Sequence, residues 1–189
     1  MLDWLIRWAM LGPAILLAAL IVRHDPQKNE PLVAVGSADA TRLTLAWADL
    51  VPAGWDPMQA WRRGDLAALP DSDPRARQAL EDMQEAWANA PTRADLEGRS
   101  VQLSGYVVPL DLGWGGVREF LLVPYAGACI HTPPPPANQV VHVRAKVTVK
   151  GLHAMDVVTV GGMLRTLRLD NDLATSGYHL EAVHVAPLP

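Results

Sequence analysis

The second half of the chain alternates apolar and other residues with a period of two, which limits the folds that it can adopt. In residues 141–149 every second position is Val or Ala. Successive side chains of a β-strand point to opposite faces, so this segment is expected to form a strand with one buried face. Three further segments alternate in the same way and are predicted to be strands: residues 101–107, 158–164 and 178–185. The short apolar run 120–123 is predicted to be a fourth.

Five strands within about 90 residues favour a small barrel, closed or partly open, of the oligonucleotide/oligosaccharide-binding (OB) type, and a β-sandwich is the alternative. Gly105 and Gly162 fall inside predicted strands, where a missing side chain relieves crowding at a sharp bend. In the last strand the apolar positions change parity after Ala182, which predicts a β-bulge or burial of both faces. The predicted fold class is mainly β with a helical N-terminal part (α+β).

One helix is predicted for residues 74–89, ahead of the strands. Asp73 is suited to cap its N-terminus, and Pro74 fits the first helical position. Its apolar residues recur along one face: Ala76, Leu80, Met83 and Trp87. The acidic residues between them are expected to form its solvated face rather than a catalytic pair. Prolines and a glycine in residues 45–57 prevent a long helix there, so this Trp-rich segment is expected to pack as an arm.

An uncharged apolar run, Trp8–Val22, lies near the N-terminus. Reading back through Arg7 to Trp4 lengthens the segment to 19 residues. About 20 apolar residues cross a bilayer, whereas the apolar part of a secretory signal needs about 7–15. The polar residues that follow argue against a buried core helix. We therefore predict that residues 1–25 form a transmembrane anchor or uncleaved signal, and that residues 4–22 contact the inner membrane.

The rest of the chain divides into a linker over residues 26–40, a helical arm over residues 41–97 and an OB-like barrel domain over residues 98–189. From residue 26 onward there are 14 Lys and Arg against 18 Asp and Glu, and no basic run. Neutralising phosphates requires clustered cations, so nucleic-acid binding is not expected.

The chain has one cysteine, Cys129, and it lies two residues before His131. In an extended segment residues i and i+2 project to the same side, so thiol and imidazole would point together with their Cα atoms about 7 Å apart. A lone cysteine cannot form an intrachain disulfide. It can be a packed core thiol, a metal ligand together with His131, or a reactive thiol beside a base.

Copper or zinc would suit this pair, although the pattern demands no cofactor. A zinc site needs further ligands, for which His142 and His179 are candidates, while Cu(I) is satisfied by fewer soft ligands. The sequence contains no phosphate-binding loop, dinucleotide fingerprint or serine elbow. Parallel i and i+2 side chains are also poorly placed for proton transfer from thiol to imidazole. We therefore expect that the protein is not an enzyme.

A run of four prolines follows the Cys–His pair: Pro133, Pro134, Pro135 and Pro136. Such a run favours the stiff polyproline II conformation, which could form a ledge for a partner or a strut along the barrel. Asn138 and Gln139 complete the predicted partner-binding segment, although such amides commonly lock a loop to neighbouring backbone.

Four segments stand out as a set: residues 47–52, 103–110, 119–125 and the string Cys-Ile-His-x-Pro-Pro-Pro-Pro-x-Asn-Gln at 129–139. Together they resemble the bacterial domain of unknown function 3299 family, over about residues 45–187. The resemblance implies an exported protein, often anchored to the envelope, that serves as an accessory part of envelope systems. Some members resemble partners of ABC-type transporters linked to metal homeostasis. Where other members carry a lipoprotein cysteine this chain has none, so its anchoring must differ.

These features lead us to expect a non-enzymatic periplasmic accessory or binding protein of an envelope transport or metal-homeostasis system. It would be anchored in the inner membrane with its soluble domain in the periplasm. Its partner, such as an ABC-type transporter, or its ligand would be contacted through Cys129–Gln139. The alternatives are a copper or zinc carrier that uses Cys129 and His131, and a thiol-dependent enzyme.

Overall fold

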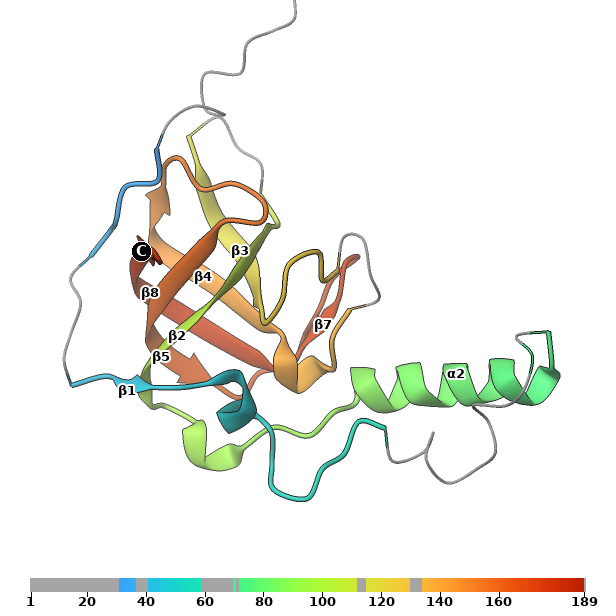
Figure 1. The fold of residues 1–189 in the computed structure, drawn as a ribbon. Coiled ribbons are helices and arrows are strands. Elements are labelled where there is room, and N and C mark those ends of the chain that lie inside the picture. Colours follow the sequence, from blue (N-terminus) through green and yellow to red (C-terminus); the bar gives the residue numbers. More distant parts are fainter. Residues whose placement is uncertain are drawn as a thin grey trace, which may run out of the picture.

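The computed structural model describes residues 31–36, 41–58, 70, 72–111, 115–129 and 134–188. In this part of the chain the protein is mainly β, with a five-stranded barrel of mixed pairing and one α-helix beside it (Figure 1). The barrel strands are β2 (Ser100–Pro109), β3 (Val117–Val123), β4 (Val141–Val149), β5 (Val157–Arg165) and β8 (Tyr178–Pro187). Each covers a segment in which the sequence predicts a strand, so all five predicted strands are confirmed.

The strand order closes the sheet into a barrel. β2 pairs with β3, β3 with β4, β4 with β8 and β8 with β5, and β5 returns to β2. Every pair is antiparallel except β4–β8, which is parallel. The long β2 closes the barrel because its residues 100–106 pair with β5 while residues 106–109 pair with β3.

Apolar side chains at alternating strand positions fill the barrel. Phe120 and Tyr178 are the largest of the fully buried ones. The prediction that the alternating apolar residues of β4 all face the core is wrong at Val147, which is 55% exposed. Ala145 and Val149, on either side of it, are buried as predicted. The pairing register between β3 and β4 shifts at this point, so an irregularity turns the side chain outward.

The predicted irregularity in the last strand is also present. Gly162 of β5 pairs with Ala182, while the preceding glycine pairs with the residue two positions further along β8. Val183 is therefore the extra residue of a bulge and is 43% exposed, and Val185 returns to the core. A Cβ atom at Gly162 would lie 2.1 Å from the carbonyl oxygen of Glu181, so this close approach requires glycine.

The segment that precedes the helix lies on the barrel wall. β1 (Leu43–Thr44) pairs in parallel with β2, and the 3-10 helix η2 (Trp47–Leu50) follows. Trp47 donates its indole Nε1–H to the carbonyl of Ser104 at 2.8 Å, and Leu50 is fully buried. The expected packing of this Trp-rich arm against the domain is thus present.

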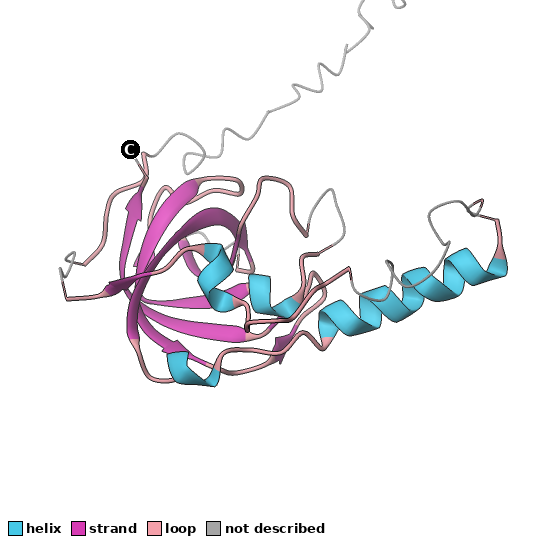
Figure 2. Cartoon of the chain, turned by 60° about the horizontal axis from the view of Figure 1, so that its bottom comes forward, coloured by secondary structure: helices cyan, strands magenta, loops and turns pink. Residues whose placement is uncertain are grey.

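Helix α2 (Pro74–Ala88) extends away from the barrel (Figures 1 and 2). The predicted cap is confirmed, because the carboxylate of Asp73 accepts a hydrogen bond from the backbone N–H of Arg75 at 2.8 Å. None of the helix residues is buried. Within the apolar stripe of the helix Leu80 is exposed, while Ala76, Met83 and Trp87 are partly buried, so the stripe is covered only in part.

Several short elements carry too little pattern to be predicted. They are the 3-10 helices η4 (Ala94–Leu96) and η5 (Ala137–Gln139) and the two-stranded sheet of β6 (Leu169–Asp170) and β7 (Thr175–Ser176). The small sheet lies beside the barrel, and its strand β6 lines the histidine-containing cleft described below (Figure 1).

The predicted anchor, residues 1–25, lies outside the described residues, as does most of the linker. In the described part of the chain no helix is both long enough and apolar enough to cross a membrane. Within the predicted linker Val35 forms an isolated antiparallel bridge with Val185, with N···O distances of 2.8 and 3.0 Å. Part of that segment is therefore tied to the barrel.

Candidate functional site

Cys129 lies in the turn that follows β3, with a left-handed φ of 64°. It is half-buried and packs against an apolar cluster that includes Leu121, Val123 and Ala128. Burial raises the pKa of the Cys129 thiol to about 11. The thiol is therefore protonated at neutral pH, which makes it a poor nucleophile.

His131 and Pro133 lie outside the described residues. The juxtaposition of Cys129 and His131 therefore stays a prediction. Among the residues that the structure describes, no three His, Cys, Asp or Glu side chains are grouped so as to hold a metal ion.

The rest of the predicted partner-binding segment is tied into the fold. Pro134 is exposed, Pro135 is buried and Pro136 caps η5. Asn138 is fully buried and donates from Nδ2 to the carbonyl of Pro91 at 2.9 Å. Gln139 donates from Nε2 to the carbonyl of Trp47 at 2.8 Å. These amides lock the loop to neighbouring backbone, and their contact with a partner stays a prediction.

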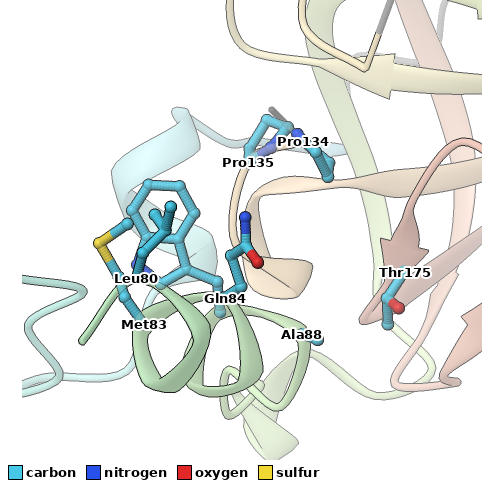
Figure 3. Close-up of a pocket in the computed structure, with 8 residues that line it drawn as sticks. Leu80, Met83, Gln84, Ala88, Pro134, Pro135 and Thr175 are labelled. Carbon is cyan, nitrogen blue, oxygen red and sulfur yellow. The ribbon is translucent and has the colours of Figure 1, made fainter. Parts of the chain in front are cut away.

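An apolar groove runs between α2 and the proline segment, and we call it the helix–proline groove (Figure 3). It has a volume of about 380 Å³. Its lining residues are Leu80, Met83, Gln84, Trp87 and Ala88 of the helix together with Pro134, Pro135 and Thr175. The indole N–H of Trp87 donates to the carbonyl of Pro57 at 2.9 Å, which fixes the ring at one end of the helix. The groove therefore presents mostly carbon surface, with few polar groups.

The second candidate site is a pair of histidines on the outer face of the barrel, which we call the histidine pair. His142 of β4 and His179 of β8 are register partners on the two parallel strands. Their neighbours Val143 and Leu180 point into the core, so the imidazoles share the opposite face. The Nδ1 atoms are 2.9 Å apart, and the stacked rings have centroids 5.1 Å apart at an interplanar angle of 27°.

A cleft of about 450 Å³, the histidine cleft, surrounds this pair. The wall beside it comes from β3, β4, the end of β2 and the β6–β7 region: Leu110, Glu119, Arg144, Leu167, Leu169, Asp170 and Asn171. Glu119 and Arg144 form an ion pair at 3.1 Å. Asn171 accepts two backbone hydrogen bonds through Oδ1, while its buried Nδ2 has no hydrogen-bond acceptor among the described residues.

The surroundings keep both imidazoles neutral. Burial lowers the pKa of His142 below its ordinary value of 6.5, and the adjacent His179 lowers it further. Burial likewise lowers the pKa of His179, against the opposing attraction of Glu181. A hydrogen bond between two neutral rings needs one Nδ1–H donor and one bare Nδ1 acceptor. The pair therefore offers nitrogen lone pairs at neutral pH, which is the form that binds metals.

The structure thus joins two of the four predicted metal-ligand candidates, His142 and His179. Cys129 lies in the turn that follows β3, and His131 lies outside the described residues. The alternation of apolar residues along each strand predicts that both histidines point outward. The residues around each histidine in the sequence do not show that the two strands are neighbours. Asn171 and Arg144, which line the same cleft, were not among the predicted site residues.

Comparison with known proteins decides the family. Residues 47–187 match the family described as "Protein of unknown function (DUF3299)". The chain belongs to this DUF3299 family. It is also similar to a solved crystal structure of a DUF3299 family protein from Pseudomonas aeruginosa PAO1, with a TM-score of 0.61 and 35% sequence identity over 78% of this chain and 97% of that chain. No curated protein matches the chain.

Three of the four segments that carry the family resemblance meet at one residue in this DUF3299 domain. Trp47 donates its indole N–H to Ser104 in the second segment. Its own carbonyl accepts the amide of Gln139 in the last segment. These motif residues therefore hold the arm, β2 and the proline loop together, which accounts for part of the family pattern without any catalytic role.

Proposed function

We propose that this DUF3299 protein is a non-enzymatic accessory protein of the bacterial envelope that binds a partner protein through the helix–proline groove. Residues 4–22 would anchor it in the inner membrane, and the domain would face the periplasm. The apolar run Trp8–Val22 and the exported location that the family resemblance implies support this location. A subunit of an ABC-type transporter is the class of partner that the same likeness suggests.

The barrel is proposed to be of the OB type. The supporting observation is the strand order, in which one long strand, β2, pairs with both β3 and β5 and a single parallel pair, β4–β8, closes the other side. Proteins with such barrels commonly use the barrel as a rigid base for binding surfaces.

The observation that carries the proposal is the partly exposed apolar stripe of α2. Leu80 is 44% exposed, and Met83 and Trp87 lie beside it along the groove. A surface helix normally turns such a stripe toward a core, but none of the α2 residues is buried. Apolar surface next to a stiff proline segment is typical of a face that takes up an apolar segment of another protein.

The groove also indicates the chemistry of that segment. Its polar lining is limited to Gln84 and Thr175, so the groove would take aliphatic or aromatic anchors rather than a charged small molecule. The exposed carboxylates Glu81, Asp82 and Glu85 lie on the same helix. Basic residues that flank the apolar anchors would complement them. We therefore expect an apolar peptide segment with basic neighbours.

Selection of short peptides from a displayed random library on the purified full-length chain tests this function. We expect enriched peptides with aromatic or aliphatic anchors beside Lys or Arg. Leu80→Glu should weaken their binding by about tenfold or more, because it places a charge in the groove. Ala86→Glu is the matched control, since it adds the same charge at an exposed position of α2 outside the groove lining.

Two results would overturn the proposal. One is the absence of any enriched peptide. The other is a set of selected peptides that bind the Leu80→Glu and Ala86→Glu variants with equal affinity. Circular dichroism of both variants shows whether α2 is retained, so that a loss of binding can be assigned to the groove.

A further inference from the structure

We propose that His142 and His179 form a binding site for a divalent transition-metal ion that prefers square-planar or octahedral coordination, Cu²⁺ or Ni²⁺, on the outer wall of the barrel. The site is separate from the predicted Cys129–His131 pair and does not depend on the helix–proline groove. It rests on the geometry of the histidine pair and on the composition of the cleft around it.

The distance between the two Nδ1 atoms indicates which coordination geometry the pair can supply. An imidazole nitrogen binds a metal at about 2.0–2.1 Å. Two such nitrogens at a right angle about one ion are therefore about 2.9 Å apart, and at a tetrahedral angle about 3.3 Å apart. The observed 2.9 Å is a hydrogen bond in the free pair, and it equals the separation of adjacent ligands in a square-planar or octahedral site, so the rings would need to turn toward a common ion but not to move apart. Nitrogen and oxygen donors in that geometry are typical of Cu²⁺ and Ni²⁺.

The strands hold this geometry in place. His142 and His179 face one another from directly paired positions of β4 and β8, within a closed barrel. Both backbones are fixed by ladder hydrogen bonds, so bringing the two ligands together costs little ordering entropy on binding. A short exposed loop with two histidines would lack this advantage.

Binding requires one proton to move. In the free pair one ring carries its proton on Nδ1, and this N–H donates a hydrogen bond to the unprotonated Nδ1 of the other ring. When the ion binds both Nδ1 atoms, the donor ring shifts that proton to its own Nε2. Both rings stay neutral, so no net proton is released.

The remaining ligands would be solvent molecules held in the histidine cleft, since no third His, Cys, Asp or Glu of the described residues is grouped with the pair. Glu119 lines the cleft and interacts electrostatically with both histidines, while Arg144 holds it in an ion pair. The buried Nδ2 of Asn171, which has no acceptor among the described residues, could donate to a water or carboxylate bound to the ion. A volume of about 450 Å³ leaves room for such groups, since a water occupies about 30 Å³.

Cu²⁺ binding to the purified full-length chain, buffered with a competing chelator, tests the site. We expect one Cu²⁺ per chain and an electron paramagnetic resonance spectrum with two equatorial nitrogens. His142→Asn and His179→Asn should each weaken binding by about tenfold or more. His153→Asn is the matched control, because this half-exposed histidine lies in the turn before β5, outside the cleft lining.

Further variants separate this site from the other proposals. Cys129→Ser and His131→Asn should leave Cu²⁺ affinity unchanged, and so should Leu80→Glu. Loss of binding in Cys129→Ser or His131→Asn, or unchanged binding in both His142→Asn and His179→Asn, would overturn the inference. If the cleft variants fail to fold, the spectrum of the unaltered chain decides, since a site without two equatorial nitrogens contradicts the proposal.

Discussion

Trp47 and Ser104 are joined by a 2.8 Å hydrogen bond from the indole N–H to the backbone carbonyl, across a sequence separation of 57 residues. The bond seats the indole against β2 beside Gly105, at the place where the N-terminal arm meets the barrel. A half-buried indole needs such a partner for its N–H. The contact explains why the next residue has no side chain, and it leads to the first prediction.

Gly105→Ala should destabilise the domain. A Cβ atom at this position would lie 2.7 Å from the Trp47 ring and 2.7 Å from the carbonyl oxygen of Val123. Since the second contact is with backbone, relief requires a shift of β3, and we expect a loss of about 1–3 kcal/mol in the free energy of unfolding. Denaturant titration measures it. Gly115→Ala is the control, because nothing lies within 4 Å of its Cβ position, and equal stability of the two variants would contradict the prediction.

Tyr178→Phe should also weaken the connection between arm and barrel. The fully buried Tyr178 hydroxyl donates to the carbonyl of Leu50 at 2.7 Å and accepts from the backbone N–H of Arg93 at 2.7 Å. Removing the hydroxyl leaves both backbone groups without this partner, at a cost of about 1–3 kcal/mol. The same denaturant titration applies. Tyr125→Phe, at a position that is 44% exposed, should change stability far less.

Cys129 should react slowly with iodoacetamide in the folded protein. Burial raises the pKa of its thiol to about 11, so the reactive thiolate is scarce at neutral pH. We expect a rate about two orders of magnitude below that of the chain unfolded in guanidinium chloride, where an ordinary pKa of about 8.5 returns. Mass spectrometry of the alkylated chain follows the rate. A folded-state rate equal to the unfolded one would show an accessible, ordinary thiol and would reopen the thiol-enzyme alternative.

The histidine pair should make the protein less stable in mild acid. The pKa values of His142 and His179 are lowered in the folded state, so near pH 6 the unfolded chain binds more protons than the native one. The free energy of unfolding therefore falls as the pH drops below about 6.5, and it is fully retained above that value. The neighbouring carboxylates Glu119 and Glu181 oppose the shift only in part.

Denaturant titrations at several pH values measure this dependence. A variant that carries both His142→Asn and His179→Asn should show a shallower loss of stability between neutral pH and about pH 5. Parallel profiles for the variant and the unaltered chain would assign the acid sensitivity to other groups. The comparison removes the contribution of the remaining histidines, which both proteins share.

Local pattern was sufficient for most of the β-strands and for the helix. Alternation located four of the barrel strands and a short apolar run located β3, while Asp73 with Pro74 marked the start of α2 to the residue. The parity change after Ala182 located the bulge at Val183. These features depend on neighbours within a few residues, such as the side-chain period or a cap, and such information is present in any short stretch of the chain.

Other features depended on strand pairing. Alternation placed Val147 on the buried face, but the shifted register between β3 and β4 turned it outward. The two-residue strands β6 and β7 carried no period to detect, yet β6 lines the histidine cleft. The burial of Cys129 could not be read from its surroundings in sequence, because the apolar cluster it packs against comes from β2, β3 and separate loops.

The sequence by itself determined which faces of the strands are apolar, where the helix begins and which family the proline string resembles. Only the tertiary structure decided that His142 meets His179 and that Trp47 meets Ser104. The physical reason is that the odd or even position of a residue along a strand determines which face its side chain points to, but not which strand lies beside it. That choice is made by the closure of the barrel, where the parallel pairing of β4 with β8 brings together histidines 37 residues apart in the chain.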